Sequence, residues 1–273
     1  MAKNLGAVTP GSRFYSDIVR TNLYKGKPIK YLKTKLVKTG GRNNQGRMTN
    51  CNIGGGAKRA YRLVDFSRRD YWNIPGIIQR IEYDPNRNAF IALVKYDGVE
   101  KLAYVLAWEG VKSGDKIICG DVVPAENGNR STLSALPLGT FVHDIEITPG
   151  KGGQVARAAG CYAQILSRDN ESVILRLRSK VVQKFMGNCL ASVGIVSNAA
   201  FKNTSYGKAG RTRNLGWRPH TRGVAKNPVD HPMGGRTKGG RPPCSPTGLR
   251  EGIKTRAKYK YSNRTIIRSR HVK

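Results

Sequence analysis

The chain has 273 residues, with 49 Lys and Arg against 17 Asp and Glu, and its formal net charge is +32 at pH 7. This length corresponds to two ordinary domains or one large domain. The charge excludes an ordinary metabolic enzyme as the default interpretation, and it favours nucleic acid over an anionic membrane or an acidic protein as the partner. Hydrophobic residues make up 38%, below the ~45–50% usual in globular domains, so we expect part of the chain to lack its own core.

The charge is concentrated at the two ends of the chain. Residues 1–59 hold 13 Lys and Arg against one acidic residue, and residues 201–273 hold 19 against two. Residues 60–128 hold nine against ten, and residues 129–200 hold eight against four. These shifts predict two basic extensions, 1–59 and 201–273, around two folded domains, 60–128 and 129–200.

The first central segment has the pattern of a small barrel. Four runs rich in β-branched and aromatic residues are separated by turn signals, among them Asp84-Pro85-Asn86-Arg87. Short strands at this spacing are typical of small barrels. The predicted strands cover residues 77–84, 90–96, 101–107 and 116–123.

The second central segment repeats this pattern, so the fold class is predicted to be mainly β. Its predicted strands cover residues 140–147, 171–179, 181–186 and 191–196. The strongest helix signal, residues 154–166, is interrupted by Gly160 and fits a strand of small side chains equally well. Residues 201–273 contain only nine Ile, Leu, Val or Phe, so we expect this extension to become ordered only against a polyanion.

Membrane, secretory and disulfide features are not expected. The sequence has no run of about 18 apolar residues, and its first residues have no apolar segment typical of a secretory signal. The five cysteines are far apart and never in C-x-x-C spacing, which favours reduced structural thiols over disulfides or a zinc ribbon. No intrinsic cofactor is predicted, although magnesium held by RNA is compatible with the sequence.

A glycine-rich segment joins the N-terminal extension to the first barrel. In Gly54-Gly55-Gly56-Ala57-Lys58-Arg59 the absent Cβ atoms let backbone amides approach phosphate, and two basic side chains follow. The P-loop spacing is absent. The alternative interpretation is a flexible hinge.

Two arginines stand beside turns where they can grip phosphate oxygens through paired hydrogen bonds. Arg87 ends the predicted hairpin turn that is expected to present it outward, and Arg157 follows the glycine-rich residues 149–153. The alternative for each is a solvated surface arginine.

His231 lies in Asn227-Pro228-Val229-Asp230-His231-Pro232. The neighbouring aspartate suggests a catalytic or metal-binding histidine, but no nucleophile elbow or second metal ligand at suitable spacing accompanies it. The two prolines favour a stiff extended path instead. We therefore favour a structural or RNA-packing role.

Aromatic residues interleaved with charge in both extensions fit stacking on unpaired bases: Tyr24, Tyr31, Tyr206, Trp217, Tyr259 and Tyr261.

An ordered set of motifs resembles the universal large-subunit ribosomal protein family conventionally called L-two, in its bacterial and organellar form. The resemblance covers nearly the whole chain. The motifs are GGRNNQGR (40–47), IGGGAK (53–58), YRLVDF (61–66), EYDPNR (82–87), PGKGGQVARAAG (149–160), GKAG (207–210) and NPVDHP (227–232).

This resemblance implies an OB-like barrel, then an SH3-like barrel, with long basic extensions of little regular structure threading through ribosomal RNA. It implies binding to large-subunit ribosomal RNA, support of the peptidyl transferase region, neighbouring ribosomal proteins, and contact with the small subunit at an intersubunit bridge. No membrane or small-molecule substrate is implied. Arg87 and Arg157 match RNA-contacting arginines of the family, and His231 matches its much-discussed histidine.

The predicted RNA-binding residues are basic side chains and glycines of the motifs and extensions. They are Arg42, Arg47, Gly54, Gly55, Gly56, Lys58, Arg59, Arg87, Lys151, Arg157, Lys208, Arg211, Arg213, Arg222, His231 and Arg236. No residue is predicted to be catalytic or to bind a metal.

The sequence departs from the family pattern after the histidine motif. The family usually continues with His-Gly-Gly-Gly-Glu-Gly, whereas residues 233–238 read MGGRTK, so a role that needs a histidine pair cannot operate. This departure, with the Lys- and Tyr-rich tail, favours a mitochondrial matrix ribosome, with the bacterial cytoplasm as the alternative. Alternative functions are a peptidyl transferase enzyme that uses His231 and a free RNA chaperone.

Overall fold

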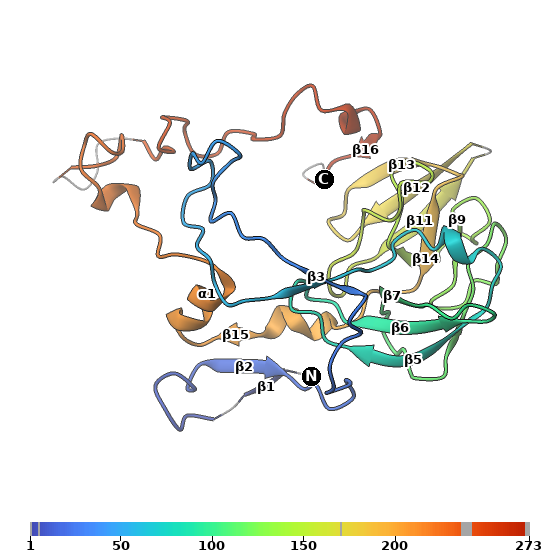
Figure 1. The fold of residues 1–273 in the computed structure, drawn as a ribbon. Coiled ribbons are helices and arrows are strands. Elements are labelled where there is room, and N and C mark those ends of the chain that lie inside the picture. Colours follow the sequence, from blue (N-terminus) through green and yellow to red (C-terminus); the bar gives the residue numbers. More distant parts are fainter. Residues whose placement is uncertain (1, 5, 170, 236–241, 271–273) are drawn as a thin grey trace. The chain divides into compact units, whose positions relative to one another are not determined.

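The computed structural model describes the chain except for residues 1, 5, 170, 236–241 and 271–273 (Figure 1). It divides into two compact units. Unit 1 contains Met1–Val37, Arg59–Lys208 and Arg264–Lys273, and unit 2 contains Lys38–Lys58 and Ala209–Asn263. The domain boundaries expected at residues 59, 128 and 200 stay a prediction.

Unit 1 contains a four-stranded antiparallel sheet, here called the first sheet, with the order β7-β6-β5-β8. Its strands are β5 (Gly76–Glu82), β6 (Ile91–Tyr96), β7 (Leu102–Leu106) and β8 (Lys116–Ile117). Apolar side chains such as Ile78, Val94 and Val105 form its core with Trp108. The predicted strands at 77–84, 90–96 and 101–107 are confirmed, but the one at 116–123 is wrong beyond Ile117, because the chain there enters a bridge and turns.

The second sheet has seven strands in the order β16-β13-β12-β11-β10-β14-β9, all paired antiparallel. A second core lies against it, and its members include Val142, Ile165, Val173, Leu175 and Phe185. The strands are β9 (Arg130–Thr132), β10 (Phe141–His143), β11 (Ala163–Arg168), β12 (Ser172–Leu177), β13 (Val182–Met186), β14 (Leu190–Val193) and β16 (Ile266–Arg268).

The predicted helix alternative at residues 154–166 is wrong. Residues 163–168 form β11, and residues 154–162 run through bends, turns and a bridge at Val155. A strand there buries Ala163 and Ile165 in the second core. The alternating small side chains therefore pack on one face of the second sheet and do not form one face of a helix.

Short regular elements also lie outside the two sheets within the described residues. In unit 1 these are β1 (Ala2–Asn4), β2 (Tyr15–Ile18), β3 (Lys33–Lys35), β4 (Ala60–Arg62), β15 (Ser205–Tyr206) and the 3₁₀ turns η1 (Arg69–Tyr71) and η2 (Ala199–Asn203). In unit 2 they are α1 (Ala209–Leu215), η3 (Gly223–Ala225) and η4 (Tyr261–Asn263). Strand β2 pairs with both β1 and β15, and β3 pairs with β4.

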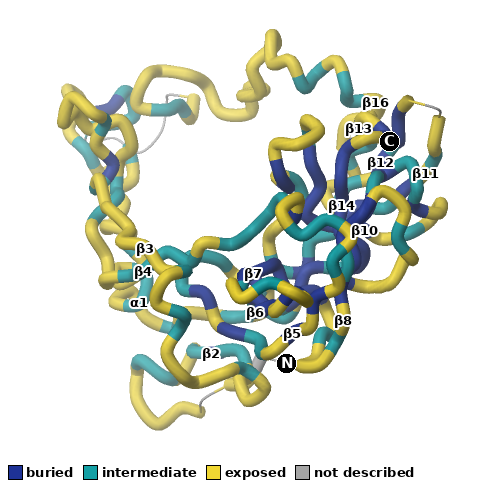
Figure 2. The backbone as a smooth tube through the Cα atoms, turned by 45° about the vertical axis from the view of Figure 1, so that its right-hand side comes forward, coloured by how far each residue is buried: buried dark blue, intermediate teal, exposed yellow. Residues whose placement is uncertain are grey.

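Burial separates the sheets from the extensions. Figure 2 shows the buried residues gathered in the strands of the two sheets, while the extensions are mostly exposed or half-buried. In the part of the chain that the structure describes, no helix has the length and apolar character needed to cross a membrane.

Candidate nucleic-acid interface

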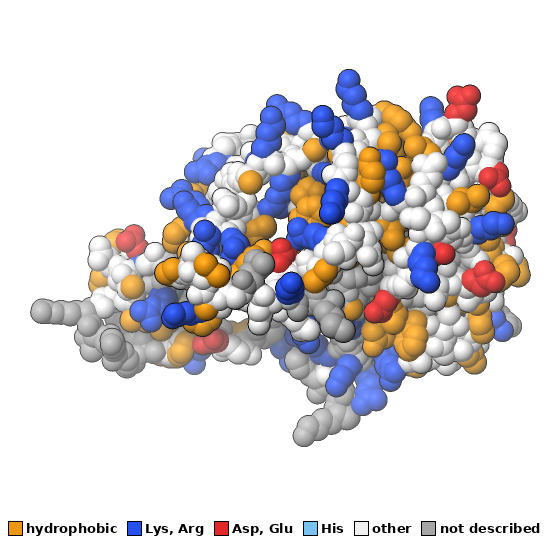
Figure 3. Space-filling view, turned by 90° about the horizontal axis from the view of Figure 1, so that it is seen from below, with side chains coloured by type: hydrophobic (Ala, Val, Ile, Leu, Met, Phe, Trp, Pro, Cys, Tyr) orange, Lys and Arg blue, Asp and Glu red, His pale blue; other side chains and the backbone are white. Residues whose placement is uncertain are grey.

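Basic side chains far outnumber acidic ones, with 49 Lys and Arg against 17 Asp and Glu. Figure 3 shows Lys and Arg side chains standing out over the visible face, with acidic side chains sparse among them. The described residues contain no group of three or more His, Cys, Asp or Glu arranged to hold a metal ion.

Phe66 brings together two arginines that the sequence predicts to bind RNA. The guanidinium carbon of Arg157 lies 4.3 Å from the centroid of the Phe66 ring, and that of Arg87 lies 5.5 Å from it. Both distances are within the range of cation–π attraction. The turn after β5 and the segment before β11 therefore converge on one ring, and two positive charges are held near each other.

Arg87 is more buried than its turn position suggests. Its side chain is only 15% exposed, and its Nε donates to Oδ2 of the fully buried Asp84 at 2.5 Å. The expected outward presentation is therefore wrong. The aspartate cannot remain buried without a partner, and it draws the guanidinium back over the turn, so only part of Arg87 faces outward.

Neighbouring polar contacts fix this turn to the start of the first folded segment. Arg59 donates from Nη1 to the carbonyl of Pro85 at 3.3 Å. Asn86 donates from Nδ2 to the carbonyl of Ala60 at 2.7 Å. The predicted residues Arg59 and Arg87 thus belong to the same surface region.

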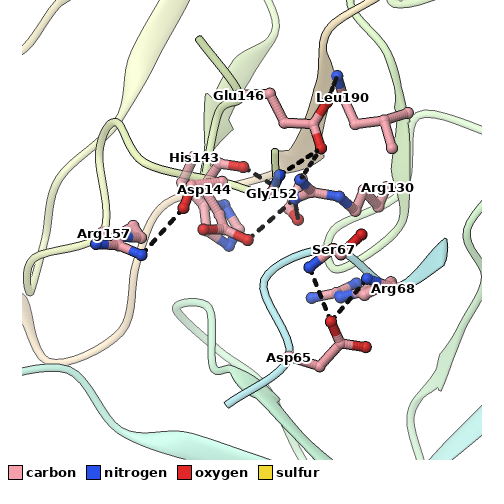
Figure 4. Close-up of polar contacts among 12 residues, drawn as sticks. Asp65, Ser67, Arg68, Arg130, His143, Asp144, Glu146, Gly152, Arg157 and Leu190 are labelled. Atoms are coloured by element: carbon pink, nitrogen blue, oxygen red, sulfur yellow. Dashed lines mark hydrogen bonds and ion pairs between the residues drawn. The ribbon is translucent and has the colours of Figure 1, made fainter. Parts of the chain in front are cut away.

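The glycine-rich loop at 149–153 is held from inside by a buried carboxylate. Glu146 is fully buried, and its oxygens accept the backbone N–H groups of Gly150, Gly152 and Leu190 at 3.1–3.2 Å (Figure 4). Gly153 donates its N–H to the carbonyl of Phe66 at 2.9 Å. The loop is therefore rigidly placed.

Two predicted basic residues belong to this loop region. Lys151 is exposed on the loop itself. Arg157 is also exposed, and its Nη1 donates to the carbonyl of Gly153 at 3.0 Å. The loop, Arg157 and the Arg87 turn together form one basic surface around Phe66, here called the Phe66 surface, consisting of Arg59, Phe66, Arg87, Lys151 and Arg157.

A buried charge cluster supports the Phe66 surface, and sequence reasoning missed it. Arg130 Nη1 donates to Oδ2 of Asp144 at 3.0 Å and to its carbonyl at 2.9 Å, and Arg130 Nη2 lies 3.6 Å from Glu146. Arg68 is buried beside it and donates to the carbonyl of Gly128 at 2.8 Å. Burial raises the pKa of Asp144, and Arg130 is the largest of the charges that oppose this rise.

His143 is buried within the same cluster as a neutral ring. Its Nδ1 donates to the carbonyl of Gly194 at 3.0 Å, and desolvation lowers its pKa to about 3. Nearby Arg68 and Arg130 lower the pKa further. The sequence signal for the cluster is the charged and polar residues His143, Asp144 and Glu146 within the predicted strand 140–147, whereas Arg130 lies outside every predicted strand.

In unit 2 the glycine-rich segment packs against the end of α1. Gly54 donates its N–H to the carbonyl of Gly216 at 2.7 Å, and Ala57 donates to the carbonyl of Asn214 at 2.8 Å. Gly56 has a φ of +59°, and a Cβ there would lie 2.7 Å from the nitrogen of Gly216. Within unit 2 the segment is therefore fixed against the end of α1, and the Gly54 amide is already engaged.

His231 is buried in unit 2. Its Nδ1 accepts the N–H of Met233 at 3.0 Å, and its carbonyl accepts the N–H of Gly234 at 2.8 Å. A Cβ on Gly223 would collide with the imidazole ring. The ring therefore organises the loop from Gly223 to Gly234.

The structure separates the remaining predicted residues between the two units. Lys208 lies exposed in unit 1, and Arg236 lies outside the described residues. The other predicted side chains are in unit 2, exposed except for the half-buried Arg211: Arg42, Arg47, Lys58, Arg211, Arg213 and Arg222.

The aromatic residues of the extensions are exposed, but some are already engaged. Tyr259 is 98% exposed and Tyr261 is 66% exposed. The guanidinium carbon of Arg80 lies 3.9 Å from the centroid of the Tyr24 ring. The Tyr31 hydroxyl accepts the N–H of Leu102 at 3.0 Å. Tyr259 is therefore the most exposed aromatic side chain among the described residues.

Comparisons with known proteins match both halves of the chain. Residues 29–119 match the family described as Ribosomal Proteins L2, RNA binding N-terminal domain, and residues 126–248 match Ribosomal Proteins L2, C-terminal domain. The first sheet lies within the N-terminal match, and most of the second sheet lies within the C-terminal match. These domains are the OB-like and SH3-like barrels, so the predicted fold class is confirmed.

Bacterial relatives match over almost the full length. The "Large ribosomal subunit protein uL2" of Mesorhizobium japonicum is 52% identical over 273 residues, covering 98% of each chain. The protein of the same name from Cereibacter sphaeroides is 50% identical over 275 residues, covering 99% of this chain and 98% of the relative. The chain is a member of the ribosomal protein L2 family.

Proposed function

We propose that this protein is a structural constituent of the large ribosomal subunit that binds large-subunit ribosomal RNA. The observation that carries the proposal is the Phe66 surface, where Arg87 and Arg157 lie over one ring. Membership of the L2 family, whose matched N-terminal domain is described as RNA binding, supports the same role.

The geometry suits RNA backbone recognition. Lys151 is exposed on a loop whose backbone Glu146 holds in place, and the exposed Arg157 follows this loop, so little backbone entropy is lost when phosphates bind. Neutralised phosphates release their counterions, which supplies most of the binding free energy and makes it depend on salt. The formal charge of +32 fits such a counterion-driven interaction.

An enzymatic role for His231 has less support. A general base must present a free ring nitrogen to the reacting proton, whereas Nδ1 of His231 accepts the Met233 amide and its ring packs on Gly223. We therefore keep His231 as a residue that organises its loop near RNA. Sedimentation in high salt distinguishes a free RNA chaperone, which would separate from the large subunits, from a structural constituent.

Three more specific expectations are part of the same proposal. They are support of the peptidyl transferase region, contact with neighbouring ribosomal proteins and contact with the small subunit at an intersubunit bridge. Magnesium held by the RNA is compatible with the site. The reported relatives are bacterial, which fits a bacterial cytoplasm better than the mitochondrial matrix favoured from the sequence.

Binding to deproteinised large-subunit RNA at several salt concentrations tests the proposal. We expect log affinity to fall linearly with log salt, by about 0.7–0.9 for each phosphate contact. Equal affinity for large-subunit RNA and for an unrelated RNA of the same length would contradict a specific ribosomal role.

A further inference from the structure

A basic pocket lies on the second sheet where the C-terminal strand joins it. The pocket has a volume of about 500 Å³ and is here called the C-terminal pocket. Five basic side chains and one aromatic side chain contribute to its lining: Tyr162, Arg176, Arg178, Lys180, Arg268 and Arg270. None of them is among the residues that the sequence predicts to bind RNA.

The pocket exists because segments far apart in the sequence meet there. Strand β16 pairs antiparallel with β13, and Val182 lies opposite Arg268. The tight turn between β12 and β13 places Lys180 at its tip with a φ of +68°. The pocket is therefore a product of the folded sheet rather than of a basic run in the sequence.

Three of the basic side chains of the pocket, Arg176, Arg178 and Lys180, have no acidic partner in its described lining. None of the described residues that line it is Asp or Glu. Arg176 donates from Nη2 to Oε1 of Gln164 at 2.6 Å, and Arg178 donates to the carbonyl of Gly160. These acceptors are neutral, so they hold the guanidinium groups in place and leave the charge intact.

We infer that the C-terminal pocket binds a backbone phosphate of ribosomal RNA, as a second contact site separate from the Phe66 surface. Guanidinium groups held by neutral acceptors retain further N–H donors for phosphate oxygens. The Tyr162 ring, which forms a T-shaped contact with the Phe141 ring, brings an aromatic side chain to the pocket lining, where it can contact the adjoining nucleotide. This inference rests on the proposed function, and its test separates the two.

The first test asks whether RNA covers Lys180 in the full chain. Lys180 is exposed and open to acetylation in the free protein, as is Lys95 on β6. With deproteinised bacterial large-subunit RNA bound, we expect acetylation of Lys180 to fall at least about fivefold and that of Lys95 to change little. Parallel samples contain polyglutamate or inorganic phosphate in place of RNA. Protection of Lys180 by polyglutamate equal to that by RNA would overturn the inference in favour of an acidic protein, and equal protection by phosphate would reduce the pocket to a simple anion site.

The second test compares two variants that each lose two positive charges. Arg176→Gln with Lys180→Gln changes the pocket, whereas Lys95→Gln with Lys116→Gln changes exposed lysines of the first sheet. We expect the pocket variant to bind the RNA at least about tenfold more weakly than the control variant. Its salt slope should fall by about 0.7–0.9 for each lost contact.

The outcomes distinguish the pocket from the protein's role. If the original protein binds the RNA, but the two variants bind it with equal affinity and Lys180 is not protected, the inference about the C-terminal pocket is wrong and the proposed function is unaffected. Failure of the original protein to bind the RNA would overturn the proposed function itself.

Discussion

Arg130 and Asp144 form a buried ion pair next to the Phe66 surface. Arg130 Nη1 lies 3.0 Å from Oδ2 of Asp144, and the two side chains are 0% and 2% exposed. Arg130 begins β9, and Asp144 directly follows β10. The pair therefore joins the entry of the second sheet to the segment that continues into Glu146 and the glycine-rich loop.

Removing Arg130 should destabilise the fold strongly. Arg130→Met leaves Asp144 and Glu146 buried without their cation, and loss of one partner of a buried pair typically costs about 3–5 kcal/mol. Urea unfolding of the full chain measures the loss. Arg168→Met, which removes an exposed arginine bonded to the Ser134 carbonyl, is the control, for which we expect less than about 1 kcal/mol. Equal losses for the two variants would contradict the assigned role of the pair.

His143 should make the fold sensitive to acid. Its pKa in the folded protein is about 3, against about 6.5 in an unfolded chain. Between these values the unfolded state binds a proton that the folded state does not, so stability falls as the pH decreases from about 6.5 towards 3, by up to about 1.4 kcal/mol per pH unit.

The variant His143→Asn isolates this effect, since the amide retains a donor for the Gly194 carbonyl but does not titrate. Urea unfolding between pH 4 and 7 should show a smaller loss of stability with decreasing pH for the variant than for the original protein. Parallel pH profiles for the two proteins would show that His143 is not buried as a neutral ring.

The sequence was sufficient to predict the two sets of strands because their patterns are local. Turn residues such as Asp84-Pro85 separate runs of β-branched and aromatic residues, and five of the eight predicted strands coincide with observed strands over most of their length. Strand ends were less predictable, as at 116–123, because a strand ends where its pairing partner ends.

The candidate site was only partly predictable, since its residues meet through long-range contacts. Arg87 and Arg157 were found through their turns, but their convergence on Phe66 depends on how the two barrels pack. The C-terminal strand β16 was missed because Ile266–Arg268 has only two apolar residues and becomes a strand only by pairing with β13. The α1 helix lies in a basic segment with no apolar face to signal it.

Arg157 and Arg87 should affect RNA binding and stability differently. Arg157→Ala removes an exposed guanidinium, and a charge-assisted hydrogen bond is worth ~1.5–3 kcal/mol, so we expect RNA binding to weaken roughly ten- to hundredfold with little change in unfolding. Arg87→Ala also leaves the buried Asp84 without its partner, and this should cost about 1–3 kcal/mol of stability. Filter binding and urea unfolding of both variants measure the two effects. Unchanged RNA affinity in both variants would remove these residues from the site.

His231 should matter for assembly rather than for chemistry. His231→Gln retains a hydrogen-bonding group, so ribosomes that contain it should form peptide bonds within about tenfold of the original rate, below the ~10²–10⁴-fold contribution of a general base. His231→Ala removes the acceptor for the Met233 amide and should reduce incorporation into large subunits. The rate of single-turnover peptide transfer on purified ribosomes, measured across a range of pH, distinguishes the two roles. A thousandfold loss in His231→Gln, with loss of a titration near pH 6–7, would revive the enzyme hypothesis.

Sedimentation of the tagged protein tests the central claim most directly. Ribosomes in a lysate of cells that express the tagged protein are washed in high salt. A sucrose gradient then separates large subunits, small subunits and free protein. A structural constituent of the large subunit remains in the large-subunit fraction after the wash, in a constant ratio to its RNA. Recovery of the protein in the free fraction after the wash, with large subunits intact, would contradict the account and identify a free RNA chaperone.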